Sequence, residues 1–303
     1  MTLSRRIRAT AFSGAVCLLV GCGTGHAGLP NASSTATFRD AVNLGPPINS
    51  QDFDGGPSLS ADGLTLYFVT DRDIVTGGDI WTATRRSAAE PFGQPRNLGS
   101  PVNSAADEGS PAISADGLDL FYDRAPDGRI FEARRSIATA PFGKPVIVDL
   151  VCSGCRDGFP AVSSDALQLY FCSDRAGGYG GDDVWMATRA STSSPFEPPV
   201  NVGPAVNSAA NDCEPTISTD GRELFFGSDR KGGSGGDDIW VSSRSSPAQP
   251  FRKTVNAGRE VNSGFSDQRP YLSPDGATLL FMSDRPGGLG SFDLWQVSRT
   301  ASS

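Results

Sequence analysis

Hydrophobic and polar positions follow one pattern that recurs five times along the chain. Each copy begins with a Pro-x-x-Ser segment, passes through an Asp-Gly or Asp-Ala pair, and continues into an apolar and aromatic run such as Leu66-Tyr67-Phe68. Two short apolar segments on either side of an Asp-Gly turn predict a β-hairpin. The prolines that anchor the five copies are Pro57, Pro111, Pro160, Pro215 and Pro270.

A third and a fourth strand are expected after each hairpin. In four copies the third strand carries tryptophan, as in Asp183-Val184-Trp185, and a Pro-Phe turn then leads to a short Val-Asn-Leu-Gly type of strand. Four antiparallel strands with two apolar faces cannot bury themselves alone, so units repeating about every fifty residues must stack on one another. The repeat therefore predicts a β-propeller.

The two ends of the repeated region complement each other. Residues 38–45 resemble a fourth strand with no repeat before them, and the fifth copy stops after its Trp295 strand without a fourth strand. Pairing these pieces removes the free edges of the sheets. We therefore expect an all-β, five-bladed β-propeller of four-stranded antiparallel blades over residues 37–303, closed by the N-terminal strand joining the last blade.

The repeat resembles the WD40-like repeat of the TolB-type propellers, which are common in bacterial envelope proteins. The residues that carry the resemblance are those of the cassette from Pro270 to Trp295 and its four copies, and they cover the chain from about residue 37 onward. The resemblance implies an envelope propeller but no particular activity. This chain shows neither the extra α/β domain nor the sixth repeat of TolB, so a role in the Tol system is not implied.

The first 21 residues have the pattern of an export signal. Three arginines precede an apolar run over residues 11–20, which is too short to span a bilayer. Leu19-Val20-Gly21-Cys22 resembles a lipobox, in which cleavage precedes a cysteine that is then acylated; a plain secretory signal is the alternative. Residues 22–36 predict a flexible tether. We expect an exported lipoprotein in the outer membrane, on its periplasmic side or at the cell surface.

The mature chain would be acidic. The net charge of the full sequence is −8, and removing residues 1–21 takes away three arginines and no acid, which gives −11. Nucleic acids and anionic lipids need a basic surface on their partner, so neither is expected to bind. Membrane contact is assigned to the lipid on Cys22, and the protein is expected to be a monomer.

A carboxylate stands three residues before every repeat proline. We expect these groups to begin the innermost strands and to form a ring at one mouth of the axial channel, where their repulsion favours a weakly bound divalent cation. The alternative is that they cap backbone amides. No other cofactor is expected. The five are Asp54, Glu108, Asp157, Asp212 and Asp267.

The positions that differ between copies at the same mouth are the candidate binding surface. Aromatic side chains beside arginine and carboxylate groups suit a peptide or glycan partner. With the five carboxylates, the candidate residues are Phe53, Arg156, Phe159, Glu214, Phe265 and Arg269.

Two further sets of repeated acids have two possible readings. The Asp-Arg pairs, such as Asp71-Arg72, and the aspartates that open the third strands, such as Asp183, resemble the oxygen donors of calcium sites. The reading we favour is that they cap turns and pair with arginine.

Four cysteines other than Cys22 lie beyond the signal segment, and export makes disulfides possible. In an antiparallel hairpin Cys172 lies level with the position two residues before the proline, which Cys213 holds in the next copy. We therefore expect a Cys172–Cys213 bond between blades and a local Cys152–Cys155 bond. A redox-active pair or a zinc site of four thiolates are the alternatives.

The sequence favours binding over catalysis. The only histidine, His26, lies in the tether, so neither a Ser-His-Asp nor a His-containing metal site is available. Residues present in every copy are explained first by the fold. We expect a non-catalytic binding or scaffolding module for an envelope protein, peptidoglycan or another glycan. The alternative is a carboxylate-dependent, glycosidase-like enzyme.

Overall fold

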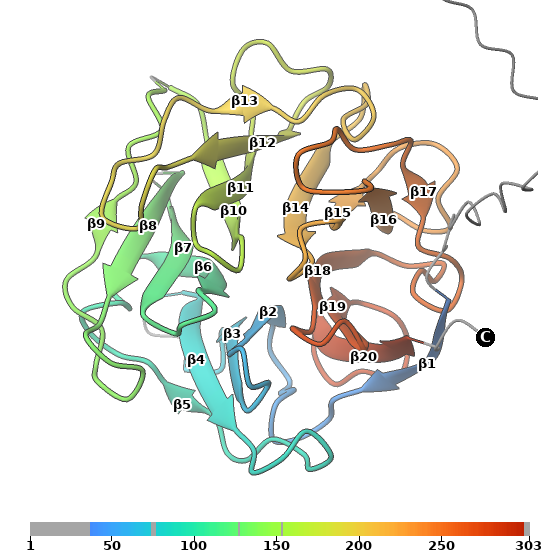
Figure 1. The fold of residues 1–303 in the computed structure, drawn as a ribbon. Coiled ribbons are helices and arrows are strands. Elements are labelled where there is room, and N and C mark those ends of the chain that lie inside the picture. Colours follow the sequence, from blue (N-terminus) through green and yellow to red (C-terminus); the bar gives the residue numbers. More distant parts are fainter. Residues whose placement is uncertain (1–36, 74–76, 127, 153, 300–303) are drawn as a thin grey trace, which may run out of the picture. The chain divides into compact units, whose positions relative to one another are not determined.

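A computed structural model describes residues 37–299 except residues 74–76, 127 and 153. This part of the chain forms five separate four-stranded sheets arranged around an axis (Figure 1). It contains no helix with the length and apolar character needed to cross a membrane. The signal segment 1–21, Cys22 and the tether 22–36 lie outside the described residues.

In blades 1 to 4 the strands follow the order of the chain from the axis outward. Blade 1 contains β2 (Asp54–Leu59), β3 (Thr65–Thr70), β4 (Asp79–Thr84) and β5 (Arg96–Asn97). Blade 2 contains β6 (Asp107–Ile113), β7 (Asp119–Ala125), β8 (Arg129–Arg134) and β9 (Val146–Ile147). Blade 3 contains β10 (Asp157–Val162), β11 (Gln168–Ser173), β12 (Asp183–Thr188) and β13 (Val200–Asn201). Blade 4 contains β14 (Asp212–Ile217), β15 (Glu223–Ser228), β16 (Asp238–Ser243) and β17 (Val255–Asn256).

Blade 5 joins the two ends of the propeller. It contains β18 (Asp267–Leu272), β19 (Thr278–Ser283), β20 (Asp293–Arg299) and, as its outer strand, β1 (Phe38–Asn43). β1 pairs antiparallel with β20, with Phe38 opposite Arg299 and Asn43 opposite Trp295 (Figure 1). The predicted five-bladed propeller with its closing N-terminal strand is confirmed.

The repeated Ser, Asp and Gly positions form the turn between the two inner strands. In blade 1 the Ser60 hydroxyl donates to the Asp62 carboxylate over 2.5 Å, and the Leu64 amide donates to the same oxygen over 2.9 Å. These two hydrogen bonds hold the pKa of Asp62 below its ordinary value. Gly63 has φ +68°, a conformation that glycine adopts without steric cost. The repeated motif thus stabilises a turn.

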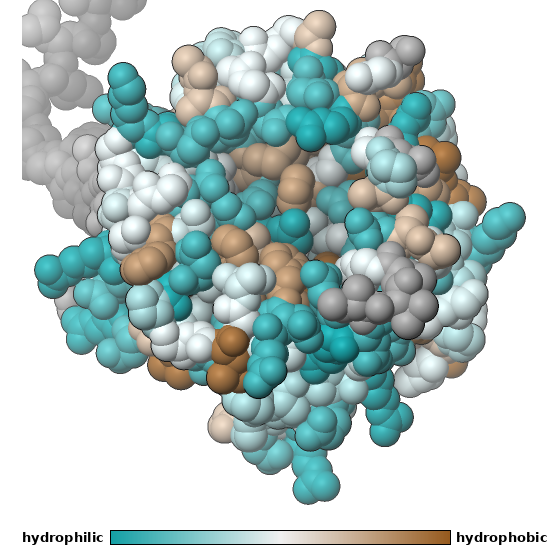
Figure 2. Space-filling model, turned by 180° about the vertical axis from the view of Figure 1, so that it is seen from behind, coloured by the Kyte–Doolittle hydropathy of each residue, from teal (hydrophilic) through white to brown (hydrophobic). Residues whose placement is uncertain are grey.

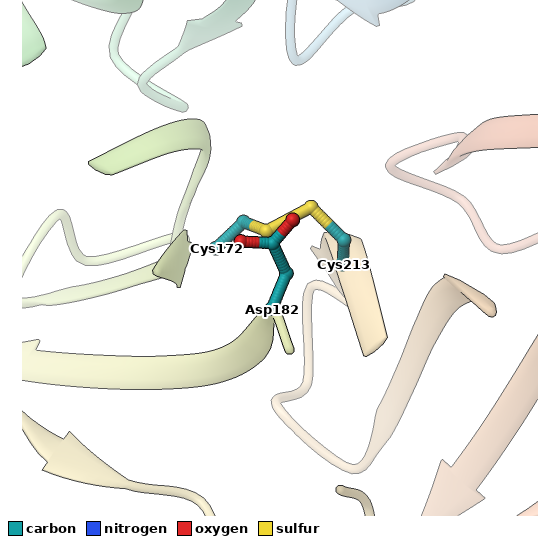
Figure 3. Close-up of side chains that lie close together, drawn as sticks. All are labelled: Cys172, Asp182 and Cys213. Atoms are coloured by element: carbon teal, nitrogen blue, oxygen red, sulfur yellow. A yellow bond between two sulfur atoms is a disulfide. The ribbon is translucent and has the colours of Figure 1, made fainter. Parts of the chain in front are cut away.

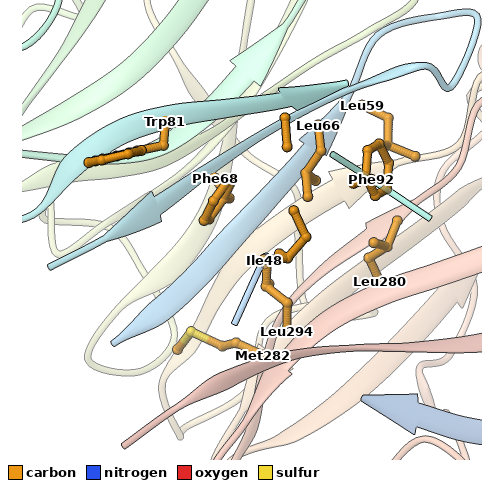
Figure 4. Packing of buried hydrophobic residues seen from close by; sticks show 10 residues of the cluster. Ile48, Leu59, Leu66, Phe68, Trp81, Phe92, Leu280, Met282 and Leu294 are labelled. Atoms are coloured by element: carbon orange, nitrogen blue, oxygen red, sulfur yellow. The ribbon is translucent and has the colours of Figure 1, made fainter. Parts of the chain in front are cut away.

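Hydrophobic side chains fill the spaces between neighbouring blades. Figure 4 shows one such cluster, in which Leu66, Phe68 and Trp81 of blade 1 pack with Met282 and Leu294 of blade 5. Burying each large apolar side chain contributes about 1.5–3 kcal/mol. Because every cluster joins two blades, packing between blades holds the propeller together.

Candidate functional site

The five carboxylates that begin the inner strands are buried inside the blades. Each forms an ion pair with an arginine of its own blade: Asp54 with Arg72, Glu108 with Arg124, Asp157 with Arg175, Asp212 with Arg230 and Asp267 with Arg285. None of the five lines the axial cavity. This geometry differs from the solvent-facing ring expected from the sequence, because each carboxylate is paired with an arginine. All but Asp157 also accept a hydrogen bond from a backbone amide, which was the alternative expectation. A cation there would have to displace an arginine.

An axial cavity of about 420 Å³ is lined by the innermost strands of all five blades. On the face shown in Figure 2, hydrophobic residues gather around the centre of the molecule. The residues directly before the repeat prolines line the cavity, and all five have φ between +49° and +59°. A bulge interrupts strand pairing there in every blade. The five residues are Gly56, Ser110, Phe159, Glu214 and Arg269.

Non-glycine residues rarely adopt this left-handed conformation, and such residues cluster at functional sites. The bulge changes the direction of these side chains, so that they point toward the centre of the propeller. Phe159, Glu214 and Arg269, which the sequence marked as candidates, are among the four non-glycine residues held in this way.

Arg269 joins three blades across this mouth. Its guanidinium lies 4.9 Å from the ring centroid of Phe159 and 5.6 Å from that of Phe53. Its Nε is 3.6 Å from Oε1 of Glu214, and its backbone amide donates to Oε2 of Glu214 over 2.8 Å. The structure therefore brings together four of the residues named from the sequence: Phe53, Phe159, Glu214 and Arg269.

Glu214 holds a proton more readily than an ordinary glutamic acid. Burial raises the pKa of Glu214, and the nearby charge of Asp237 raises it further, whereas Arg269 opposes both effects. The carboxyl group has room because Gly227 lies beneath it, where a Cβ atom would stand 2.7 Å from Oε2. A carboxyl group with a raised pKa beside a cavity is a candidate general acid.

Asp123 of blade 2 is a carboxylate that contacts the cavity residue Phe159, and the sequence analysis missed it. Its Oδ2 accepts a hydrogen bond from the Phe159 amide over 2.7 Å. A Cβ atom at Gly109 would stand 2.3 Å from Oδ1, so this glycine makes space for the carboxylate. The signal in the sequence was the short second copy, which has aspartate where the other blades have Val69, Cys172, Gly227 or Met282.

Two other candidates lie away from the cavity. Arg156 is 74% exposed and pairs with Asp174 over 3.3 Å and with Asp182 over 3.8 Å. Phe265 is exposed and does not line the cavity. The variable positions at this end of the propeller thus divide into a central group around Arg269 and an outer group.

Two disulfides form among the described cysteines. Cys172 is bonded to Cys213 across the interface of blades 3 and 4, and Cys152 is bonded to Cys155. Figure 3 shows the Asp182 carboxylate beside the first of these bonds. Because these four sulfur atoms are bonded in pairs, they cannot coordinate zinc as four thiolates. Because Cys213 directly precedes Glu214, the bond between blades also anchors the backbone of the candidate acid.

No protein-family model matches the chain, and no curated protein matches it either. Several solved structures are similar to the chain. An α-L-arabinofuranosidase from Podospora anserina is 13% identical, with 88% of this chain and 98% of that chain covered and a TM-score of 0.58. A thermostable family-43 glycoside hydrolase is 14% identical, covers 85% and 93% of the two chains, and has a TM-score of 0.57. TolB from Acinetobacter baumannii is 13% identical, covers 83% and 55%, and has a TM-score of 0.50.

The likeness shows a propeller fold shared with TolB and with glycoside hydrolases. The sequence-based expectation that the chain is not an enzyme is contradicted by these neighbours, because structures matched over nearly the whole of both chains include glycoside hydrolases. The sequence argument against catalysis rested on the residues that every copy shares, and it assigned the positions that differ, Glu214 among them, to binding. Glu214, which lines the cavity, occurs in one blade only.

Proposed function

We propose that this protein is a glycoside hydrolase whose active site lies at the mouth of the axial cavity, around Glu214, Asp123 and Arg269. The observation that carries the proposal is Glu214, a buried acid with a raised pKa in the lining of the axial cavity. Asp123, which accepts from the amide of the cavity residue Phe159, is the second carboxylate that we assign to the site. Glycoside hydrolysis needs one carboxyl group that holds a proton and one that accepts a proton or stabilises positive charge. The carboxylate-dependent alternative drawn from the sequence is therefore preferred.

Glu214 acts as the general acid in this proposal. It donates its proton to the glycosidic oxygen as the bond between that oxygen and the anomeric carbon breaks. Water adds to the anomeric carbon, and Asp123 accepts the proton that the water loses. If the two carboxyl groups lie about 6.5–9.5 Å apart, the configuration inverts, whereas a separation of about 5 Å favours retention through a covalent intermediate.

The residues around the two carboxyl groups suit a sugar ring. Phe53 and Phe159 offer apolar faces, and Arg269, which lies against both rings, offers donors to hydroxyl groups. A cavity of about 420 Å³ is at the small end of the range for ligand pockets, about 300–1,000 Å³. The site therefore fits the end of a glycan or a single branch. Three of the structural neighbours are α-L-arabinofuranosidases, which makes an arabinofuranosyl branch the first substrate to test.

The proposal includes export and a lipid anchor at Cys22. The lipobox-like residues 19–22 support it, and the two disulfides suit a compartment outside the cytosol. The enzyme would then act on glycans at the cell envelope, with the lipid as its membrane contact. Metabolic labelling with a radioactive fatty acid should label the wild-type protein and leave Cys22→Ser unlabelled.

Hydrolysis assays test the activity. The full chain should release arabinose from a nitrophenyl α-L-arabinofuranoside or from arabinoxylan. Glu214→Gln and Asp123→Asn should each lower kcat at least about 100-fold, the lower end of a general acid–base contribution. Glu260→Gln, a change at an exposed side chain, serves as the matched control and should keep full activity. Melting temperatures show whether each variant folds. A folded wild-type protein that hydrolyses no glycan in a panel of neutral and acidic substrates would remove the proposal.

A further inference from the structure

An arginine ends the third strand of every blade and stacks on a phenylalanine. The distances from each guanidinium carbon to its ring centroid are 4.3–5.3 Å. The five arginines hold equivalent places, because the backbone amide of each donates to the turn of the inner hairpin. They are Arg85, Arg135, Arg189, Arg244 and Arg299.

Four of these arginines reach an oxygen of the preceding blade. Arg135 donates to the Tyr67 hydroxyl over 3.1 Å, and Arg244 donates to the Tyr170 hydroxyl over 3.1 Å. Blades 2 and 4 have phenylalanine at the position of these tyrosines. In both, a glutamate of the same blade accepts the hydrogen bond from the arginine instead. The remaining two bonds join Arg189 to Glu132 over 3.0 Å and Arg299 to Glu223 over 2.8 Å.

Arg85 lacks such a partner among the described residues. Blade 5, which precedes it around the ring, has Leu280 where Tyr67 and Tyr170 stand and Thr278 where Glu223 stands. Arg85 donates only to the backbone oxygens of Gly63, over 2.8 Å, and of Ala88, over 3.1 Å. Burial lowers the pKa of Arg85, and the charge of Asp275 in blade 5 opposes this effect without a hydrogen bond between the two side chains in the described part of the chain.

A cavity of about 510 Å³ opens at this one interface. It is lined by Arg85, Phe92, Thr278, Leu280 and Gln296, among others. Figure 4 shows Leu59, Phe92 and Leu280 in the adjoining hydrophobic cluster. The substitution of tyrosine by leucine removes both an oxygen acceptor and the ring that would fill the space.

This cavity meets the axial cavity. Leu59, Ala61, Pro274 and Asp275 line both. The two cavities therefore adjoin at the inner hairpin turns of blades 5 and 1. In the other four interfaces a tyrosine or phenylalanine ring stands where blade 5 has Leu280.

We infer that the cavity between blades 5 and 1 is a binding site for a neutral saccharide, an inference on ligand class that rests on the proposed function. Arg85 and Gln296 donate to sugar oxygens, and Phe92 and Leu280 offer apolar faces. Asp62, Glu90 and Asp275 accept from sugar hydroxyl groups and disfavour an anionic ligand, since three carboxylates face one arginine. A hydroxyl group of the ligand takes the place of the tyrosine oxygen in the other interfaces.

Two substitutions at one position test the inference. Leu280→Tyr introduces the residue that fills this place in blades 1 and 3, and Leu280→Met keeps an apolar side chain of similar volume. Isothermal titration of the full chain with xylotriose and with cellotriose should give at least a tenfold weaker affinity for Leu280→Tyr and no change for Leu280→Met. Melting temperatures confirm folding. Arg85→Gln removes the cation and adds no ring to the cavity, and it should also weaken binding about tenfold.

The outcomes separate this inference from the proposed function. Hydrolysis of a small nitrophenyl arabinoside, which occupies only the axial site, should be unchanged in Leu280→Tyr. Equal trisaccharide binding by wild type and Leu280→Tyr, no binding to either while hydrolysis persists, or tighter binding of a uronic acid trisaccharide would each overturn the inference. Loss of binding in Leu280→Tyr from a wild-type protein that hydrolyses nothing would support the site and reject the enzyme.

Discussion

Asp54 and Arg72 form a buried ion pair at the start of blade 1, with Oδ1 and a terminal guanidinium nitrogen 2.7 Å apart. The other carboxylate oxygen accepts hydrogen bonds from the backbone amide and the hydroxyl of Ser50. The guanidinium carbon lies 5.5 Å from the ring centroid of Phe68 and 5.4 Å from that of Trp81. One carboxylate thus connects the incoming loop, the inner strand and the aromatic core of the blade.

Replacing this carboxylate should destabilise the protein. Asp54→Asn removes the charge opposite Arg72 and leaves a largely buried cation without its partner, which costs about 3 kcal/mol. Urea unfolding of the variant should show this loss in the free energy of unfolding. Glu260→Gln, which changes the exposed pair with Arg259, should alter stability by less than about 0.5 kcal/mol. Equal losses in both variants would contradict the structural role of the pair.

The fold could be predicted because the sequence repeats. The spacing of prolines, turn residues and tryptophans gave the number of blades, and the unmatched ends at Phe38 and Trp295 gave the closure. Capping of backbone amides by the repeated carboxylates was the alternative drawn from the sequence. Their pairing with arginine was not predicted, since Asp54 and Arg72 are 18 residues apart in the chain.

Part of the candidate site could be predicted from the sequence. Comparing the copies singled out Phe159, Glu214 and Arg269, because these residues replace one another at a single repeat position. Asp123 required the structure, since its role depends on the glycines that make room for it and on an amide of the next blade. A repeat pattern reports what the blades share, whereas chemistry depends on where single blades differ.

The pH dependence of hydrolysis should report the state of Glu214. A general acid must hold its proton, so activity should fall as the pH rises through the pKa of Glu214, which lies above its ordinary value of 4.5. Asp237→Asn removes a negative charge that raises this pKa, so the alkaline limb of the kcat/KM profile should move to lower pH. The profile of Glu260→Gln should not move. A shift to higher pH in Asp237→Asn would contradict the assignment.

The same proton should influence stability. The folded protein keeps the Glu214 proton at pH values where the unfolded chain has lost it, so the free energy of unfolding should decrease as the pH rises from about 4.5 through the folded-state pKa. Glu214→Gln cannot lose a proton and should lack this part of the slope. Urea unfolding at a series of pH values measures it, and parallel curves for the two proteins would exclude the coupling.

Gly227 should be required for the position of Glu214. Gly227→Ala places a Cβ atom 2.7 Å from Oε2 of Glu214, so the carboxyl group must move. A displacement of about 1 Å in a catalytic group can cost about 100-fold in rate, and we expect kcat to fall at least tenfold. Gly264→Ala is the matched control, since a Cβ atom there meets nothing within 4 Å. Normal kcat in folded Gly227→Ala would argue against Glu214 as the acid.

The bond between Cys172 and Cys213 should contribute more to stability than the local one. It closes a sequence separation of 41 residues, for which the loss of chain entropy in the unfolded state corresponds to about 4 kcal/mol, against about 2 kcal/mol for the separation of 3 between Cys152 and Cys155. Paired serine substitutions, compared by urea unfolding under oxidising conditions, measure both values. Titration that finds these four sulfhydryls free in the oxidised protein would exclude both bonds.

Asn49 should hold the closing interface of the propeller. Its side-chain amide donates to the backbone oxygen of Leu294 and its Oδ1 accepts from the Leu294 amide, both over 2.9 Å, in a buried setting. Asn103 makes the same two contacts with Ile80 within blade 1. Asn49→Ala and Asn103→Ala each leave one buried backbone amide without its acceptor, whereas the carbonyls of Leu294 and Ile80 still accept from the amides of Leu44 and Leu98. Each variant should lose about 2 kcal/mol of stability. Hydrogen exchange should increase at Leu294 in the first variant only and at Ile80 in the second only. Unchanged protection of Leu294 in Asn49→Ala would show that this side chain does not hold the segment before β2 to blade 5.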